Sequence, residues 1–495
     1  MSTAAEPRLQ LGGFVADLAV VQAADGRAWL ATAAMAVATD VAVRHQPGSA
    51  TAAFVIVVAG ALALSGRLVR PAARALALAA PVFGACLGLY ASPLMVALNS
   101  CAGAGLLALA ASMARDGDPH DVTLPDLIRR SLAAVAHGTA APAFLLGREG
   151  PLARRRAGDR AARWPAVARG VLLAAPVLLV VGALLGTADP VFASWFHAGR
   201  AGDLARHVLV LGIGAWAGGG LLRMASSAAP GPLPPIGRHL GFVESVTVLG
   251  SLVALYTAFA LAQVVAMLGG ASTVLHATGL TYAEYARSGF FQLLAVATLT
   301  LGILLAIRAS ADLSTPSRRR AFLMLAESAV VLTIAIVVVA VRRLHLYENA
   351  YGLTLPRLVA SVFALWVGVV FAMLGASLAG VHRRRRWLVP AAIAFGLVCV
   401  VALDVVNPDR LVVDRNLDHY AHTGKIDVDH LAGLSDDAVP ALAGALPRLD
   451  AVTRAAVVQR LCAGAAPSRP DWLSRTRSSD LADQARRRVC PFSSK

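Results

Sequence analysis

The chain has 495 residues, of which 57% are hydrophobic and only 15% are charged, and its mean hydropathy is +0.65. Soluble domains carry charge on roughly 25% of their residues, so this composition excludes an ordinary soluble protein and indicates an all-α, polytopic membrane protein. A net charge of +16 would suggest nucleic-acid binding in a soluble chain, but the arginines here lie in loops between apolar runs, so no nucleic-acid partner is predicted.

Apolar runs predict about eleven membrane helices, because a helix of about 20 residues spans the hydrocarbon core. The third and fourth runs are separated only by "YASP", so they form a tight hairpin or one broken unit, and whether both cross the membrane stays open. The predicted spans cover residues 27–43, 50–66, 73–90, 92–112, 167–187, 204–223, 240–267, 290–307, 321–341, 357–380 and 387–405.

The distribution of arginine and lysine predicts which loops face the cytoplasm. With the N-terminus inside, the inner loops hold 25 of the 45 basic residues and the outer loops hold seven, and the other 13 follow the last span. Basic residues concentrate in cytoplasmic loops, so this bias places the C-terminus outside. The predicted segments are a cytoplasmic N-terminus (1–26), the first transmembrane helices (27–112), a basic amphipathic cytoplasmic loop (113–166), the main transmembrane domain (167–406) and an extracytoplasmic helical tail (407–495).

The large cytoplasmic loop contains a predicted amphipathic helix in "TLPDLIRRSLAAVAH", Thr123 to His137. Thr123 and Asp126 form a capping-box start, and one stripe carries apolar side chains at Leu124, Leu127, Ile128 and Val135. The following "RRRAGDRAARW", Arg154 to Trp164, suits anionic lipid headgroups beside the bilayer, although its arginines can also serve only to set orientation.

A polar stretch, "HLYENAYGLTLPR" (His345–Arg357), separates two long apolar runs on the predicted outer side. Tyr347 and Tyr351 suit the membrane interface, where aromatic rings with a polar tip are favoured. Gly352 is expected to break the chain before the next span. The stretch is either an interfacial turn or part of an extracytoplasmic site.

Two glutamates lie within predicted spans, where ionisable groups are costly and mark candidate functional sites. Glu244 begins the seventh span beside a polar stripe, and Glu327 lies two turns into the ninth. The pair predicts a proton or cation path across the cytoplasmic half of the membrane. Alternatively, both glutamates lie near span ends, pair with arginines and reach water.

The tail provides candidate structural features but no catalytic or metal motif. Cys462 and Cys490 are predicted to form a disulfide if the tail is extracytoplasmic, and Ser435 is expected to cap a helix. Aspartates and histidines mix in "DRNLDHYAHTGKIDVDH" (Asp414–His430), but their spacing fits no metal-site class, so neither a metal nor a cofactor is predicted. Sequence motifs for nucleotide binding, zinc proteases, serine hydrolases and kinases are absent from the chain.

Four blocks of sequence resemble a family of bacterial multi-pass membrane proteins known only by a domain of unknown function. The blocks are "GTADPVFASWF" (186–196), "YARSGFFQLLAVATL" (285–299), "YENAYGLTLPRL" (347–358) and "NPDRLVVDRNL" followed by "GKIDVDHLAGLSDDAVPAL" (407–442). The resemblance covers roughly residues 165–445. It implies a bacterial inner-membrane location and makes these blocks recurring motifs, but it carries no activity or substrate.

The predicted topology places all four blocks at the outer face, where they form a candidate polar cluster. Its members are Asp189, Glu284, Arg287, Glu348, Tyr351 and Arg357. Three functions remain open: a non-enzymatic sensory, scaffold or envelope-associated protein, which we favour; a secondary transporter that uses Glu244 and Glu327; and a membrane enzyme acting on lipid or envelope precursors. The lipid bilayer is the one predicted partner, and the sequence identifies no protein partner.

Overall fold

The computed structural model describes residues 24–45, 48–146, 199–227, 240–268, 289–311, 314–381, 386–463 and 471–490. All named elements in these ranges are helices, which confirms the all-α prediction. The chain divides into two compact units. Unit 1 contains the described residues up to 227 together with 435–437 and 471–490, and unit 2 contains 240–434 and 438–463.

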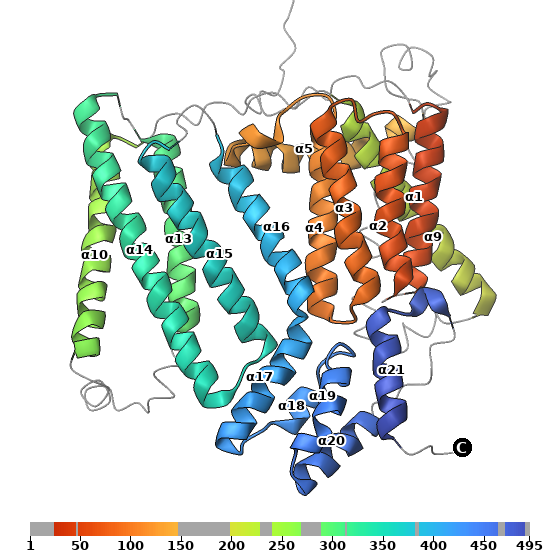
Figure 1. Ribbon diagram of the computed structural model, residues 1–495. Helices are drawn as coiled ribbons and strands as arrows, with labels where there is room; N and C mark the ends of the chain where they lie inside the picture. Colours follow the sequence, from red (N-terminus) through yellow and green to blue (C-terminus); the bar gives the residue numbers. More distant parts are fainter. Residues whose placement is uncertain are drawn as a thin grey trace, which may run out of the picture. The chain divides into compact units, whose positions relative to one another are not determined.

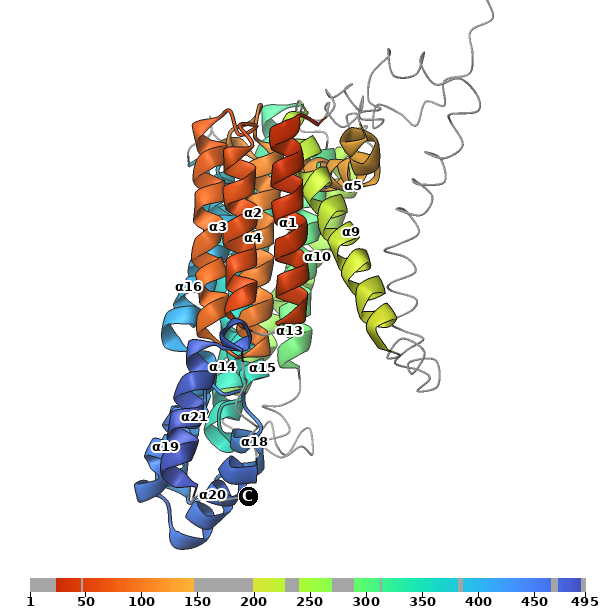
Figure 2. The same cartoon turned by 90° about the vertical axis from the view of Figure 1, so that its right-hand side faces the viewer.

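Unit 1 is a bundle of long helices that run side by side (Figures 1 and 2). A further helix, α5, lies across one end of the bundle, and the last two elements of the chain lie at the opposite end. The elements are α1 (Gly26–Arg44), α2 (Ser49–Leu64), α3 (Pro71–Leu89), α4 (Pro93–Ser112), η1 (Pro119–Asp121), α5 (Leu124–Leu145), α9 (Gly199–Ser226), η3 (Trp472–Ser474) and α21 (Arg477–Val489).

Small residues allow α9 to approach α1 closely. A Cβ atom added at Gly214 would lie 2.8 Å from the Ala36 Cα, and one added at Gly218 would lie 2.9 Å from the Met35 sulfur. Glycines four residues apart lie on one helix face. Lipid already solvates apolar surface, so membrane helices associate mainly through close van der Waals packing, which faces of small residues allow. The pair Gly214 and Gly218 therefore sets the α1–α9 contact.

Unit 2 combines long apolar helices with the short helices of the tail (Figure 1). The helix α14 begins behind a Thr315 cap, whose hydroxyl accepts from Arg318 N at 3.4 Å, with Pro316 in the first position. The elements are α10 (Phe242–Leu268), α13 (Phe290–Ser310), α14 (Pro316–Tyr351), α15 (Leu355–Leu378), α16 (Leu388–Val406), α17 (Pro408–Thr423), α18 (Val428–Ala432), α19 (Val439–Ala445), η2 (Leu446–Arg448) and α20 (Ala451–Ala463).

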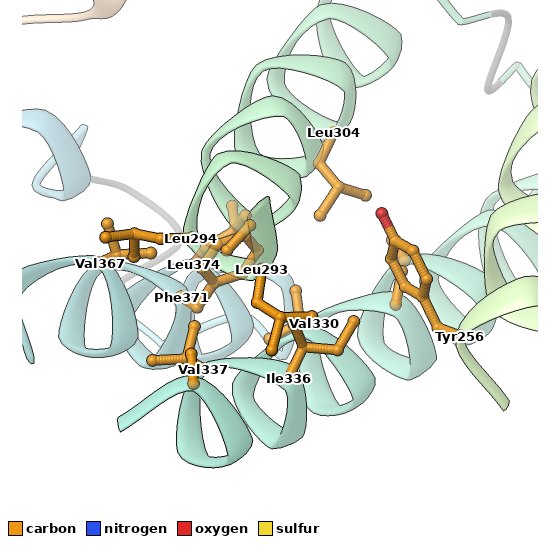
Figure 3. Packing of buried hydrophobic residues seen from close by; sticks show 14 of the residues in the cluster. Tyr256, Leu293, Leu294, Leu304, Val330, Ile336, Val337, Val367, Phe371 and Leu374 are labelled. Carbon is orange, nitrogen blue, oxygen red and sulfur yellow. The ribbon is translucent and has the colours of Figure 1, made fainter. Parts of the chain in front are cut away.

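The interior of unit 2 is an apolar core between α10, α13, α14 and α15 (Figure 3). Leu294, Phe371 and Leu374 are at most 6% exposed. The polar groups in this core satisfy one another: the Tyr256 hydroxyl and the Thr300 hydroxyl are 2.5 Å apart, and Thr300 also donates to Val296 O at 2.7 Å. Burial of a hydroxyl is tolerated when it is hydrogen-bonded in this way.

Eight of the described helices are long and apolar enough to cross a membrane. They are α3, α4, α10, α13, α14, α15, α16 and the Arg206–Ser226 part of α9. The predicted spans 27–43 and 50–66 coincide with α1 and α2, but α2 has only 16 residues and α1 contains Arg27, Asp40 and Arg44. The span 167–187 lies outside the described residues, so the predicted number of about eleven spans is not confirmed.

The structure corrects the expectation of a loop at His345–Arg357. The helix α14 has 36 residues and continues to Tyr351, ten residues beyond the predicted span. At 1.5 Å per residue it is about 54 Å long, well over the roughly 30 Å hydrocarbon core. The polar residues after Val341 extend the helix because they include no breaker before Gly352. Hydropathy marks the end of the apolar run, whereas the helix itself ends at the glycine.

Residues 435–437 fasten α21 to the turn between α3 and α4, all within unit 1. The buried Asp437 carboxylate accepts hydrogen bonds from Ala91 N at 3.0 Å and Ser92 N at 2.7 Å, and its other oxygen accepts from the Ser478 hydroxyl. The expected role of Ser435 as a helix cap is wrong. Its hydroxyl donates to Asp437 at 3.0 Å, and α19 begins only after Ala438.

We expect Asp437→Ala to lower the free energy of unfolding by about 3 kcal/mol, because several donors would lose one charged acceptor in a buried place. Asp436→Ala is the matched control. It removes a partly exposed ion pair with Arg486 (2.8 Å) and should cost about 1 kcal/mol or less. Thermal unfolding of the purified proteins in detergent, with protease cleavage before α21 as a second readout, makes the comparison. Equal losses in the two variants would contradict the assigned role of Asp437.

Candidate functional site

A compact polar cluster surrounds the turn between α14 and α15 in unit 2. We call it the Glu348 cluster, and its members are Tyr347, Glu348, Tyr351, Arg357 and Asn416. Helix α14 contributes the first three, α15 contributes Arg357, and α17 contributes Asn416. The cluster lies in the part of α14 that extends beyond the apolar run.

Glu348 is the central acidic group of the cluster. Its side chain is 19% exposed, and its Oε1 atom is buried with no hydrogen-bond partner among the described residues. The other oxygen lies 3.9 Å from His345 Nδ1. Burial raises the pKa of the Glu348 carboxyl, and His345, Arg357, the Ser361 hydroxyl and Arg415 oppose that rise. A carboxylate oxygen enclosed in this way provides a hydrogen-bond acceptor for a small polar ligand or a water molecule.

Arg357 connects the end of α14 to the start of α15. Its guanidinium lies 4.0 Å from the centre of the Tyr347 ring and also donates to Gly352 O. The Tyr347 ring in turn meets the Tyr351 ring edge to face, with centroids 5.0 Å apart. A planar guanidinium stacked on an aromatic ring is held in one orientation, so its remaining donors are directed for binding.

Asn416 joins the third and fourth sequence blocks. Its side-chain amide donates to Leu353 O at 2.7 Å, across 63 residues of sequence, and to Val412 O at 2.7 Å within its own helix. Gly352, which has a φ of +77°, packs against the Asn416 side chain, and a Cβ at this position would overlap the Asn416 amide oxygen. The α14–α15 turn and α17 therefore fit together only with a glycine at this position.

The junction between α16 and α17 positions Asn416. Asn407 ends α16 in the left-handed region, with φ +56°, and its side chain accepts from Arg410 N at 3.2 Å to start α17. Asparagine adopts this conformation more readily than other residues with a side chain. Pro408 then takes the first helical position, where its missing N–H costs nothing. The chain thus changes direction within one residue as it leaves the predicted span.

The structure brings together part of the predicted outer cluster. Glu348, Tyr351 and Arg357 lie around the same turn, whereas Asp189, Glu284 and Arg287 lie outside the described residues. The sequence analysis missed Asn416, for which no local signal exists because its partners are distant in the chain. His345 and Glu348 are three residues apart, a spacing that makes side chains neighbours on a helix. Because the sequence predicted a loop here, the spacing did not indicate a contact.

The predicted intramembrane glutamates differ in setting. Glu244 lies in the first turn of α10 and is exposed, where a negative charge complements the helix dipole. Glu327 is half-buried in α14. The start of α10 meets the start of α14, since the Arg318 guanidinium lies 5.6 Å from the Phe242 ring. Use of either glutamate in transport stays a prediction.

The cysteines of the tail occur in disulfide form. Cys462 and Cys490 are both disulfide-bonded, whereas Cys86, Cys101 and Cys399 are free. Disulfides persist in oxidising compartments. The side of the membrane on which the tail lies stays a prediction, as does lipid binding by Arg154–Trp164, which falls outside the described residues.

The charged side chains that act on Glu348 are Arg357, Arg415 and, when it is protonated, His345. Within the described ranges, no group of three or more His, Cys, Asp or Glu side chains is placed to hold a metal ion.

Comparison with known proteins identifies a family for this chain. No curated protein and no solved structure matches the chain. A family model does match residues 72–445, described as a domain of unknown function, DUF4153. The match begins about 90 residues earlier than the resemblance seen in the sequence, so it includes α3, α4 and α5. The chain is therefore a multi-pass membrane protein that belongs to the DUF4153 family.

Proposed function

We propose that this protein is a non-enzymatic protein of the bacterial cytoplasmic membrane, with a sensory or scaffolding role in the envelope. In this proposal the Glu348 cluster and the tail helix α17, both in unit 2, form its extracytoplasmic binding surface. The observation that carries the proposal is the Asn416 contact, which fixes α17 to the α14–α15 turn. A surface held in one conformation before binding loses less entropy when a partner binds, which favours a role in recognition.

Two features favour this function over the alternatives. A transporter requires a polar route at membrane depth, whereas the unit 2 core between α10, α13, α14 and α15 is apolar and its hydroxyls bond to each other or to the backbone. A membrane enzyme that acts on lipid or envelope precursors requires a general acid and a base. Glu348 instead has cationic neighbours, which suit the recognition of an acidic or polar partner.

The function is tested in a bacterial strain that depends on this protein for growth under envelope stress. We expect Arg357→Ala and Glu348→Gln to abolish complementation while immunoblots of the membrane fraction show unchanged abundance. Arg357→Lys keeps the charge but loses the planar stacking on Tyr347, so partial function is expected. The double variant Glu244→Gln/Glu327→Gln should complement fully.

Two outcomes would contradict the proposal. If abundance falls in step with function in Arg357→Ala and Glu348→Gln, the cluster only holds the fold together. If the double glutamate variant is abundant but inactive, the protein works by transport, and the intramembrane glutamates become its functional residues.

A further inference from the structure

Helix α5 has two faces of unusual composition. Its buried face carries polar groups, with Arg130 and His137 at most 7% exposed beside Ala133 and Phe144. Its exposed face carries large aliphatic side chains: Leu124 is 38% exposed, Ile128 48%, Leu132 46% and Val135 66%. On a helical wheel these four positions fall within about 80° of one another. We call them the α5 stripe.

The α5 stripe contains no charged residue. Thr139 is an exposed polar residue within its arc and Ser131 lies at its edge, whereas Asp126 and Arg129 lie to the side and pair with each other at 3.0 Å. In a water-soluble protein, the outward face of a surface helix is normally rich in charge. The composition of this face is that of a lipid-facing surface, like Leu78 (68% exposed) and Val82 (57%) on the membrane helix α3.

The position of α5 in unit 1 places this stripe at the membrane boundary. The helix lies crosswise beside one end of the bundle, where it packs mainly against α9 and does not run parallel to the long helices (Figures 1 and 2). Its C-terminal end is tied to the start of α1, where Ala24 N donates to Phe144 O at 3.2 Å. Because the opposite face, which carries Arg130, Ala133 and His137, is buried inside unit 1, the stripe cannot turn inward.

From this composition and position, we propose that the α5 stripe inserts into the bilayer interface, so that α5 lies in the plane of the membrane with its aliphatic side chains among the acyl chains below the headgroups. An amphipathic helix binds there in proportion to the apolar area that it buries. The occupant is lipid because α5 lies at one end of a bundle that contains the membrane helices α3 and α4, and it exposes the same kind of aliphatic side chain as α3 does. This proposal does not depend on the function of the Glu348 cluster.

Spin labelling of the full chain in lipid nanodiscs tests the proposal. Cys86, Cys101 and Cys399 are replaced by alanine, and the disulfide-bonded cysteines are left in place. One nitroxide is attached at Leu132→Cys, at Val82→Cys as the lipid-facing reference, or at Asp118→Cys as the exposed connector reference. Val135→Cys provides a second position on the stripe. Power-saturation measurements compare collision with oxygen, which partitions into lipid, and with a water-soluble nickel chelate.

We expect labels at Leu132 and Val135 to prefer oxygen over the nickel chelate, at a depth between those of the Val82 and Asp118 references. A preference for nickel equal to that at Asp118 would show that the stripe faces water, which overturns the proposal. Low accessibility to both reagents would show that protein covers the stripe, either another part of this chain or a second copy, and this result also overturns it.

Discussion

Gly352→Ala should destabilise the protein by about 3 kcal/mol or more, although the change adds only one methyl group. Two costs combine. A side chain at φ +77° and ψ +173° is in a region that is essentially restricted to glycine, and such strain costs on the order of 1–3 kcal/mol. The new Cβ also displaces the Asn416 side chain, which then loses its bonds to Leu353 O and Val412 O, each worth about 1 kcal/mol.

The matched control is Gly424→Ala, at the end of α17. Gly424 also has a positive φ, +68°, but a Cβ there would meet no atom within 4 Å. We expect it to cost only about 1 kcal/mol. Thermal unfolding in detergent measures both variants, and hydrogen exchange in α17 reports whether the helix has detached from the turn.

A double variant separates backbone strain from the clash. Asn416→Ala removes the overlapping amide, so Gly352→Ala in that background should cost less than it does in the native chain. If the two losses are simply additive, Asn416 does not pack on Gly352 as described. If Gly352→Ala and Gly424→Ala are equally damaging, the effect is one of backbone conformation alone.

Acidification should loosen the contact between α5 and α9 through His137. The Arg223 guanidinium donates to His137 Nδ1 at 2.5 Å, and the Ser227 hydroxyl lies 3.2 Å from Nε2, so the folded state requires a neutral imidazole. Burial, and secondarily the Arg223 charge, lowers the pKa of His137 from 6.5 to about 4. The unfolded chain therefore binds more protons between these two pKa values, and stability falls as the pH falls through this range.

The size of the loss follows from the shift in pKa. Full stability is present above about pH 6.5, and about 3 kcal/mol is lost by pH 4, below which the loss is complete. His137→Gln retains an acceptor for Arg223 and does not titrate. Between pH 6.5 and pH 4, we therefore expect this variant to lose about 3 kcal/mol less stability than the native chain loses. His120→Gln, in the exposed η1, is the matched histidine control, and its stability should depend on pH as that of the native chain does. Identical pH profiles for the native chain and His137→Gln would contradict the assignment.

Local features of this chain were predictable from sequence, and contacts between distant segments were not. The capping box of α5 was recognisable because Thr123 and Asp126 are three residues apart, and the structure contains it. The apolar stripe was largely recognised too, although Leu132 belongs to it and Leu127 is half-buried. Helical periodicity alone does not state whether an apolar stripe turns inward, and here the stripe is exposed while Arg130 and His137 are buried on the other face among apolar side chains.

The Glu348 cluster was predicted only in part. Hydropathy identified the apolar run of α14 but ended the helix at residue 341, because charged residues were interpreted as a loop. The contact between Asn416 and Gly352 spans 64 positions and has no signature in either segment. The roles of Asp437, as an acceptor shared by three segments, and of His137, as an acceptor for a buried arginine, also require the tertiary structure.

The side of the membrane on which each end of unit 1 lies is the central claim. The structure places α5 and α21 at opposite ends of one bundle, and the distribution of arginines predicts α5 inside and the tail outside.

The most direct test is a membrane-impermeant maleimide, applied to intact bacterial spheroplasts. The chain carries alanine at Cys86, Cys101 and Cys399 and one added cysteine, either Leu481→Cys in α21, at a site that is 44% exposed, or Asp118→Cys in the connector before α5. We predict that Leu481→Cys is labelled in intact spheroplasts and that Asp118→Cys is labelled only after the membrane is permeabilised. Labelling of Asp118→Cys in intact spheroplasts, with Leu481→Cys protected, would reverse the topology and place α21 in the cytoplasm.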